Sequence, residues 1–102
     1  MTEYRLHCFA ESGNSYKAAL MLELSGCDWS PLWVPFFEGA TRKPEWRDGL
    51  NQMGEAPVLV HGPRVLTQSG VILDYLADVT GKFAGRDADE KREIWRWILF
   101  DN

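Results

Sequence analysis

The stretch "YRLHCFAESGNSYKAALMLELSG", residues 4–26, indicates a strand, a turn and a helix in immediate succession. Residues 4–9 form a short apolar run that is rich in strand-forming residue types. The turn "SGNS", residues 12–15, follows and leads into "YKAALMLEL", which consists mostly of good helix formers. Ser15 is expected to cap the N-terminus of this helix, and Gly26 is expected to end it. The turn has the spacing of a Cys-x-x-Cys redox turn, with a hydroxyl in place of each thiol.

Four further segments can be placed downstream of this opening unit. Residues 31–37, "PLWVPFF", predict a strand at a sheet edge, because proline lacks the N–H that an inner strand needs. Residues 43–51, "KPEWRDGLN", predict a short helix with proline near its start. Residues 56–67, "APVLVHGPRVLT", predict a β-hairpin. Residues 69–81 have helical spacing of apolar positions, with Ser69 as the expected N-cap and the final glycine as the stop.

The resulting order, β-α-β-α-β-β-α, predicts an α/β domain with a mixed sheet over residues 1–81. The first two strands should be parallel, because a helix connects them, and the last two should be antiparallel. Residues 82–87 predict a polar linker, and residues 88–102 predict the start of a further helix. One face of that helix is apolar and carries Ile94, Trp95, Ile98 and Leu99. This face should pack on the preceding domain, on a second chain, or on residues outside this sequence.

Composition restricts the class of protein. The chain has 102 residues, of which 45% are hydrophobic and 25% are charged, with a net charge of −4. These values predict one small globular domain, and the absence of a basic run argues against a nucleic-acid partner. We expect no membrane span, because no apolar run approaches about 18 residues, and no signal peptide. The two cysteines match no metal motif, so we expect a reduced, cytoplasmic protein without a metal.

The order of the elements and three motifs along the chain together resemble those of a known protein family. The motifs are the S-x-x-S turn of residues 12–15, "EAPVL" at 55–59 and "TQSGVILDYL" at 67–76. Over residues 4–81 the chain resembles the N-terminal domain of cytosolic glutathione transferases, of a bacterial type near the zeta, tau and theta classes. The resemblance implies a thioredoxin-like four-stranded mixed sheet. It also implies that residues 82–102 are the linker and the first helix of a truncated all-α C-terminal domain. Family members are usually homodimers, so a homodimer is expected here.

The resemblance places the catalytic position on Ser12, where thioredoxin carries its first cysteine. Glutathione supplies its own thiol, so the protein only has to stabilise the thiolate. A hydroxyl that donates a hydrogen bond to sulfur, near the positive end of a helix, favours the charged form. The alternative is that Ser12 and Ser15 serve only as turn and cap residues, which serine favours anyway.

The resemblance also implies the groups that bind glutathione. The Ala56–Pro57 bond should be cis, so that the main chain of Ala56 pairs with the cysteinyl backbone. Gln68 and Ser69 should hold the γ-glutamyl group, although a plain serine cap would explain Ser69 equally well. Arg42 is expected at the glycine carboxylate, where a solvated loop charge is the alternative.

One residue departs from the family pattern. Glu55 occupies a position where tau-like members have a lysine, and its carboxylate would repel the glycine carboxylate of glutathione.

The sequence leaves three candidate functions to compare. The first is glutathione transfer to an electrophilic small molecule, with glutathione as co-substrate. The second is a non-catalytic thioredoxin-like module that binds glutathione or a protein. A thioredoxin-type dithiol oxidoreductase is disfavoured, because serine replaces cysteine at both turn positions.

Overall fold

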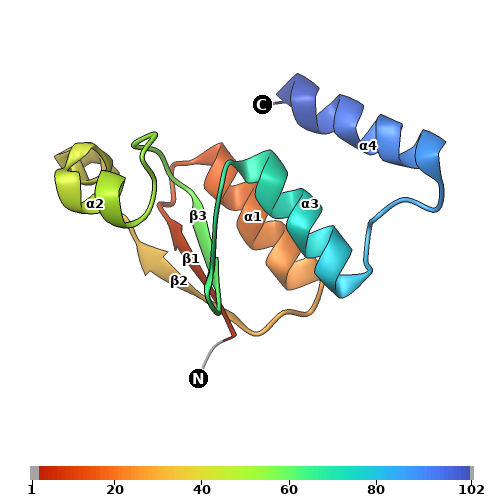
Figure 1. Cartoon of the computed structure of the whole chain (residues 1–102), viewed down its shortest axis with the longest axis horizontal. Helices are drawn as coiled ribbons and strands as arrows, with labels where there is room; N and C mark the ends of the chain where they lie inside the picture. The colour runs from red at the N-terminus through yellow and green to blue at the C-terminus, as the bar shows by residue number, and fades with distance from the viewer. Residues whose placement is uncertain (1–2, 102) are drawn as a thin grey trace.

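The computed structural model describes residues 3–101, which form a four-stranded sheet with helices on both sides (Figure 1). The elements in chain order are β1 (Tyr4–Cys8), α1 (Gly13–Leu24), β2 (Trp29–Trp33), the 3₁₀ turns η1 (Phe36–Glu38) and η2 (Ala40–Arg42), α2 (Pro44–Gly49), β3 (Val58–His61), β4 (Arg64–Thr67), α3 (Ser69–Thr80) and α4 (Ala88–Asp101). This order confirms the β-α-β-α-β-β-α prediction. The two 3₁₀ turns between β2 and α2 were not predicted.

The strand order is β2-β1-β3-β4. β1 and β2 are parallel, whereas β1 with β3 and β3 with β4 are antiparallel, as the connections predicted. β2 lies at the sheet edge, where its Pro31 is tolerated. α1 and α3 pack together on one side of the sheet, and α2 lies on the other side (Figure 1). The sheet therefore brings the start of α1, the start of β3 and the start of α3 to one end of the domain.

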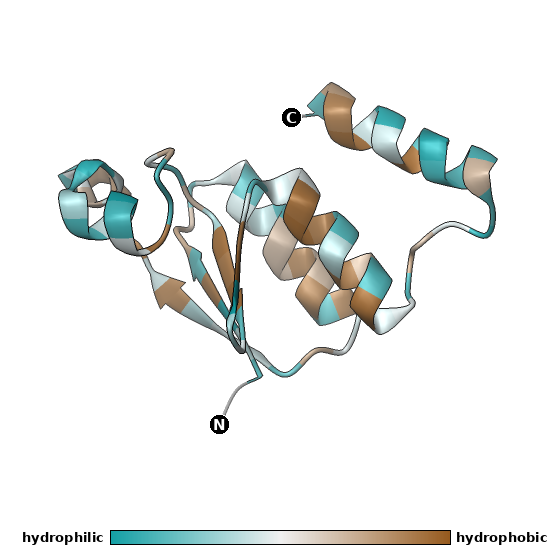
Figure 2. Ribbon diagram, in the orientation of Figure 1, coloured by the Kyte–Doolittle hydropathy of each residue, from teal (hydrophilic) through white to brown (hydrophobic). Residues whose placement is uncertain are grey.

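The core lies between the sheet and the α1–α3 pair, where the hydrophobic residues of the ribbon gather (Figure 2). Leu6 of β1 and Leu59 of β3 are register partners, and both are fully buried. Leu22 from α1, with Ile72 and Leu76 from α3, covers the same face and is also fully buried. Each such side chain gains about 1.5–3 kcal/mol on leaving water, so this layer holds the two helices to the sheet.

The starts of α1 and α3 differ from the sequence predictions. The N-cap of α1 is Ser12, not Ser15: the Ser12 hydroxyl accepts the backbone N–H of Ser15 at 3.0 Å. Either serine could cap a helix by residue type. A cap side chain accepts the N–H of the third helical residue, and here that residue is Ser15, so Ser12 is the cap. Ser69 is likewise not a cap but the first residue of α3, and Gln68 precedes it with a positive φ of 72°.

The predicted helix stops are confirmed. Gly26 follows the end of α1 with a φ of +71°, and Gly81 ends α3 with a φ of +70°. Glycine adopts this left-handed conformation without the steric cost that a side chain would add.

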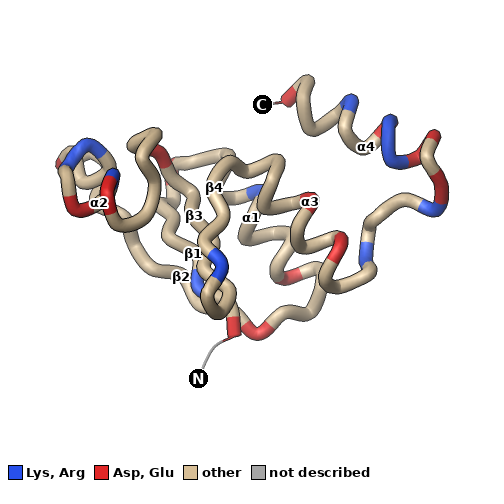
Figure 3. The backbone as a smooth tube through the Cα atoms, viewed as in Figure 1, with Lys and Arg blue, Asp and Glu red and all other residues tan. Residues whose placement is uncertain are grey.

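α4 packs against the preceding domain through part of its apolar face. A Cβ placed on Gly70 of α3 would lie 2.8 Å from the Cγ2 atom of Ile98, so the two helices approach closely at this point. The Nζ of Lys17 and the Oδ2 of Asp101 form an ion pair at 2.7 Å, which joins the end of α4 to α1. Ile94, Trp95 and Ile98 are half-buried, whereas Leu99 is exposed. Acidic and basic side chains both occur along this helix (Figure 3).

Candidate functional site

A polar pocket of about 230 Å³ lies at the end of the sheet where three segments meet. The segments are the first turn of α1, the loop before β3 and the start of α3. The lining residues are Asn14, Glu55, Ala56, Pro57, Gln68 and Ser69. The fold thus brings together four residues that the sequence assigned to glutathione binding. Ser12 and Arg42 are not among the lining residues.

The loop before β3 is fixed by α2. The Ala56–Pro57 peptide bond is cis, as the resemblance implied. The backbone carbonyl of Glu55 accepts hydrogen bonds from the Trp46 indole at 3.2 Å and from the Asn51 amide at 3.0 Å. Trp46 and Asn51 are both buried, so these bonds anchor the loop from inside the protein.

Gln68 spans the pocket toward the same loop. Its side-chain Nε2 donates to the Oε1 of Glu55 at 3.0 Å and to the Sδ of Met53 at 3.1 Å. These contacts join the residue before α3 to the residue before the cis bond. They hold the Gln68 amide in one orientation at the edge of the pocket.

Ser69 closes the pocket at the start of α3. Its hydroxyl donates to the Oδ1 of Asn14 across 3.4 Å, and the Ser69 residue is buried. The first N–H groups of a helix have no partner within the helix, and the helix dipole makes that end positive. The start of α3, a helix of 12 residues, therefore favours a carboxylate in the pocket.

Ser12 lies beside this pocket, two residues before Asn14. Its hydroxyl accepts the Ser15 N–H, and a hydroxyl that accepts one hydrogen bond still has its own proton to donate. The Ser15 hydroxyl is different: it is buried, and it has no hydrogen-bond partner among residues 3–101. The cap therefore leaves Ser12 able to donate to a ligand at the positive end of α1.

Arg42 is not among the residues that line the pocket, and its expected contact with the glycine carboxylate stays a prediction. It ends the η2 turn, and its guanidinium rests against Gly39, where an added Cβ would be 3.1 Å from Nη2. Among the described residues that line the pocket, Glu55 is the one with an ionisable side chain. The sequence prediction named neither Asn14 nor Glu55 as binding residues. The position of Asn14 inside the S-x-x-S turn was the signal that could have identified it.

The two cysteines are poorly suited to act as nucleophiles. Burial raises the pKa of the Cys8 thiol and of the Cys27 thiol, which disfavours the reactive thiolate. Both thiols are free of disulfide bonds. A thiol brought by a ligand is therefore better placed for chemistry at the polar pocket than either cysteine.

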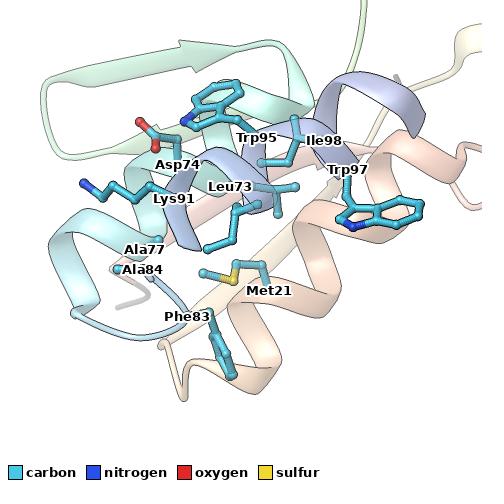
Figure 4. Close-up of a pocket in the computed structure, with 11 residues that line it drawn as sticks. Met21, Leu73, Asp74, Ala77, Phe83, Ala84, Lys91, Trp95, Trp97 and Ile98 are labelled. Atoms are coloured by element: carbon cyan, nitrogen blue, oxygen red, sulfur yellow. The ribbon is translucent and has the colours of Figure 1, made fainter. Parts of the chain in front are cut away.

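A second, larger cavity of about 380 Å³ lies between α4 and the α1–α3 pair (Figure 4). Met21, Leu73, Trp95 and Ile98 are among the side chains that line it, and the side chain of Asp74 lies beside Trp95. It contains none of the residues that the sequence assigned to binding or catalysis. Its apolar lining offers few groups that could orient a polar peptide, so we place the candidate site at the smaller polar pocket.

None of the helices within residues 3–101 is long and apolar enough to cross a membrane. That part of the chain also has no group of three or more His, Cys, Asp or Glu side chains that could hold a metal ion.

Comparison with known proteins agrees with the fold. Residues 11–79 match the family model "Glutathione S-transferase, N-terminal domain". Glutathione S-transferase GST-4.5 from Xanthomonas campestris is 38% identical over 79 residues, which covers 72% of this chain and 39% of that protein. Disulfide-bond oxidoreductase YfcG from Escherichia coli is 29% identical over 99 residues, which covers 90% of this chain and 46% of that protein.

Among solved structures, the theta class glutathione S-transferase from Xanthomonas axonopodis pv. citri, with glutathione bound, superimposes with a TM-score of 0.86 at 28% identity. The match covers 95% of this chain and 47% of that one. The chain spans about a third to a half of the length of the curated relatives it matches. Its mixed sheet and its helices are those of the thioredoxin-like fold. The chain belongs to the glutathione S-transferase N-terminal domain family.

Proposed function

We propose that the chain binds glutathione and stabilises its thiolate for transfer to an electrophilic small molecule. The observation that carries the proposal is the meeting of Ala56, Pro57, Gln68 and Ser69 in one polar pocket beside the start of α1. In this proposal the γ-glutamyl carboxylate lies at the N-terminus of α3, where Ser69 begins the helix. The main chain of Ala56 pairs with the cysteinyl backbone. Arg42 does not line this pocket, and its role at the glycine carboxylate stays a prediction.

The chemical step needs little from the protein beyond charge stabilisation. A free thiol has a pKa of about 8.5, so a small fraction is ionised at neutral pH. A hydrogen bond from the Ser12 hydroxyl, together with the positive end of α1, stabilises the thiolate, and the thiol proton passes to water. The thiolate sulfur then forms a bond to an electrophilic carbon, and the leaving group departs with its electron pair.

The first prediction is that glutathione binds to the folded 102-residue chain with a dissociation constant of about 1 mM or tighter. S-methylglutathione should bind similarly, because Ala56, Gln68 and Ser69 contact the peptide and not the sulfur. Titration calorimetry with both peptides measures this. If a sample that is folded by circular dichroism gives no heat with either peptide at millimolar concentration, the proposed site is wrong.

Disulfide reduction is a second candidate, supported by the relative named as a disulfide-bond oxidoreductase. The same bound thiolate would attack a disulfide sulfur, form a mixed disulfide and release the other sulfur as a thiolate. A second glutathione would then be needed to resolve the mixed disulfide. Assays with an aryl halide and with a small disulfide, both with glutathione, separate the candidates. Binding without turnover of either substrate would instead support a non-catalytic glutathione-binding module.

We also propose that the chain forms a homodimer, and this gives the second prediction. In α4, 55% of Trp97, 67% of Leu99 and 80% of Phe100 is exposed, and such exposed apolar side chains favour association. Light scattering should give a mass near twice 11.7 kDa. Leu99→Asp should shift the mass toward the monomer, whereas Leu24→Asp, at an exposed position on α1, should not. A monomer at all concentrations would contradict the proposal.

A further inference from the structure

His61, the last residue of β3, lies between a carboxylate and a phenol. Its Nε2 is 2.8 Å from the Oε2 of Glu3, and its Nδ1 is 2.6 Å from the Oη of Tyr75. These partners are 58 and 14 positions away in the sequence, so only the assembled fold creates the cluster. β3 begins beside the polar pocket and ends at His61, and none of the three residues lines that pocket. The Glu3–His61–Tyr75 cluster is therefore separate from the candidate glutathione site.

The chemistry of the carboxylate sets the direction of both hydrogen bonds. A carboxylate can only accept, so the Nε2 of His61 carries the proton that Glu3 accepts. A neutral imidazole has one N–H, so Nδ1 is then an acceptor and the Tyr75 hydroxyl donates to it. A hydroxyl that donates to a base, with the base oriented by a third group, is the arrangement that activates a nucleophile.

Packing holds the imidazole in this orientation. The His61 ring stacks on the ring of Tyr4, its register partner in β1, with 4.0 Å between centroids and 16° between planes. The His61 side chain is 22% exposed, and Tyr75 is half-buried. The base is therefore fixed, while the Tyr75 side chain keeps partial access to solvent and to small molecules.

We propose that Tyr75 is a nucleophile that accepts acyl groups from small activated esters. The Tyr75 Oη forms a bond to the carbonyl carbon of the ester, and its proton passes to the Nδ1 of His61. The C–O bond to the leaving group breaks, and that group departs as an anion with its electron pair. The imidazolium then loses its proton to water. Glu3 is a positioning residue, because it holds His61 in the tautomer that accepts this proton.

The three tyrosines of the chain provide an internal comparison. Tyr16, on α1, is 64% exposed, whereas Tyr4 is 5% exposed. Burial is the main cause that raises the pKa of Tyr4 to about 12, which disfavours its phenolate. If exposure alone determined reactivity, Tyr16 would react first. The base at His61 instead makes Tyr75 the most reactive of the three, although it is less exposed than Tyr16.

The test is the reaction of the 102-residue chain with p-nitrophenyl acetate at pH 8, where a histidine side chain is ordinarily neutral. Glutathione is left out, so the result does not depend on the proposed function. Mass spectrometry of the peptides over time gives the acetylation rate at each tyrosine. Tyr75 should react about tenfold faster than Tyr16, because a general base contributes about 10²–10⁴-fold and half-burial offsets part of this gain. An equal or faster rate at Tyr16 would overturn the proposal.

Two variants separate activation from a purely structural contact. His61→Phe keeps a ring against Tyr4 and removes the base, so acetylation of Tyr75 should slow by about a hundredfold. Glu3→Gln can donate to Nε2 and so permits the wrong tautomer, and it should slow the reaction by about tenfold.

The rate at Tyr16 should stay unchanged in both variants, which a general loosening of the fold would not allow. Glu45→Gln, at an exposed position of α2, is the matched control for Glu3→Gln and should leave the Tyr75 rate unchanged. If neither His61→Phe nor Glu3→Gln slows acetylation of Tyr75, the cluster is only a structural hydrogen-bond network and the proposal is wrong. Should His61→Phe fail to fold, Glu3→Gln decides alone, because the Glu3 side chain is 58% exposed and lies outside the core.

Discussion

Leu22→Ala is expected to lower the free energy of unfolding by about 2–5 kcal/mol. Leu22 is 0% exposed and belongs to the core layer in which α1 meets the sheet and α3. Removing its side chain loses the transfer free energy of the deleted atoms and leaves a cavity that the neighbours fill only in part. Small domains are stable by about 5–15 kcal/mol, so this single change removes a large fraction of the total. Urea denaturation followed by tryptophan fluorescence measures it.

The matched control for this prediction lies two residues away on the same helix. Leu24 is 60% exposed, and Leu24→Ala should change the free energy of unfolding by less than about 0.5 kcal/mol. Both changes make the same substitution in α1, so helix propensity contributes equally to each. Equal losses at the two positions would show that the layer between α1, α3 and the sheet does not determine stability.

The arrangement of the strands could be predicted from local patterns. The hairpin over β3 and β4 follows from two β-branched runs around a Gly-Pro turn, and a helix between β1 and β2 requires a parallel pair. The prolines near β2 placed that strand at an edge, where the structure has it. These features depend on residue types within short segments, which is why the sequence alone was sufficient for them.

The positions of individual polar groups could not be predicted in this way. Ser12 and Ser15 are both good caps by type, and the choice between them depends on where the backbone turns into α1. Arg42 lies in a 3₁₀ turn that the sequence did not indicate, and this turn directs it toward Gly39. Asn14 reaches Ser69 across 55 positions of sequence, a contact that only the assembled fold creates.

Ser12→Ala is expected to raise the thiol pKa of bound glutathione by about one to two units. A hydrogen bond to a charged group is worth about 1.5–3 kcal/mol, and one pKa unit corresponds to about 1.36 kcal/mol. Because Ser12 is also the cap of α1, the same change should lower the free energy of unfolding by about 0.5–2 kcal/mol. Absorbance of the thiolate followed against pH, at saturating glutathione, reports the first effect. Urea denaturation reports the second.

Ser15→Ala is the control that separates the two serines. The Ser15 hydroxyl is buried without a hydrogen-bond partner among residues 3–101, so its removal relieves a desolvation cost and should leave stability unchanged or slightly higher. It should not move the thiol pKa. Ser12→Thr keeps both a cap and a hydroxyl. It should therefore retain most of the thiolate stabilisation and most of the stability that the cap contributes. A shift of the thiol titration in Ser15→Ala, with none in Ser12→Ala, would mean that Ser15 contacts the sulfur and that Ser12 serves α1 only as its cap.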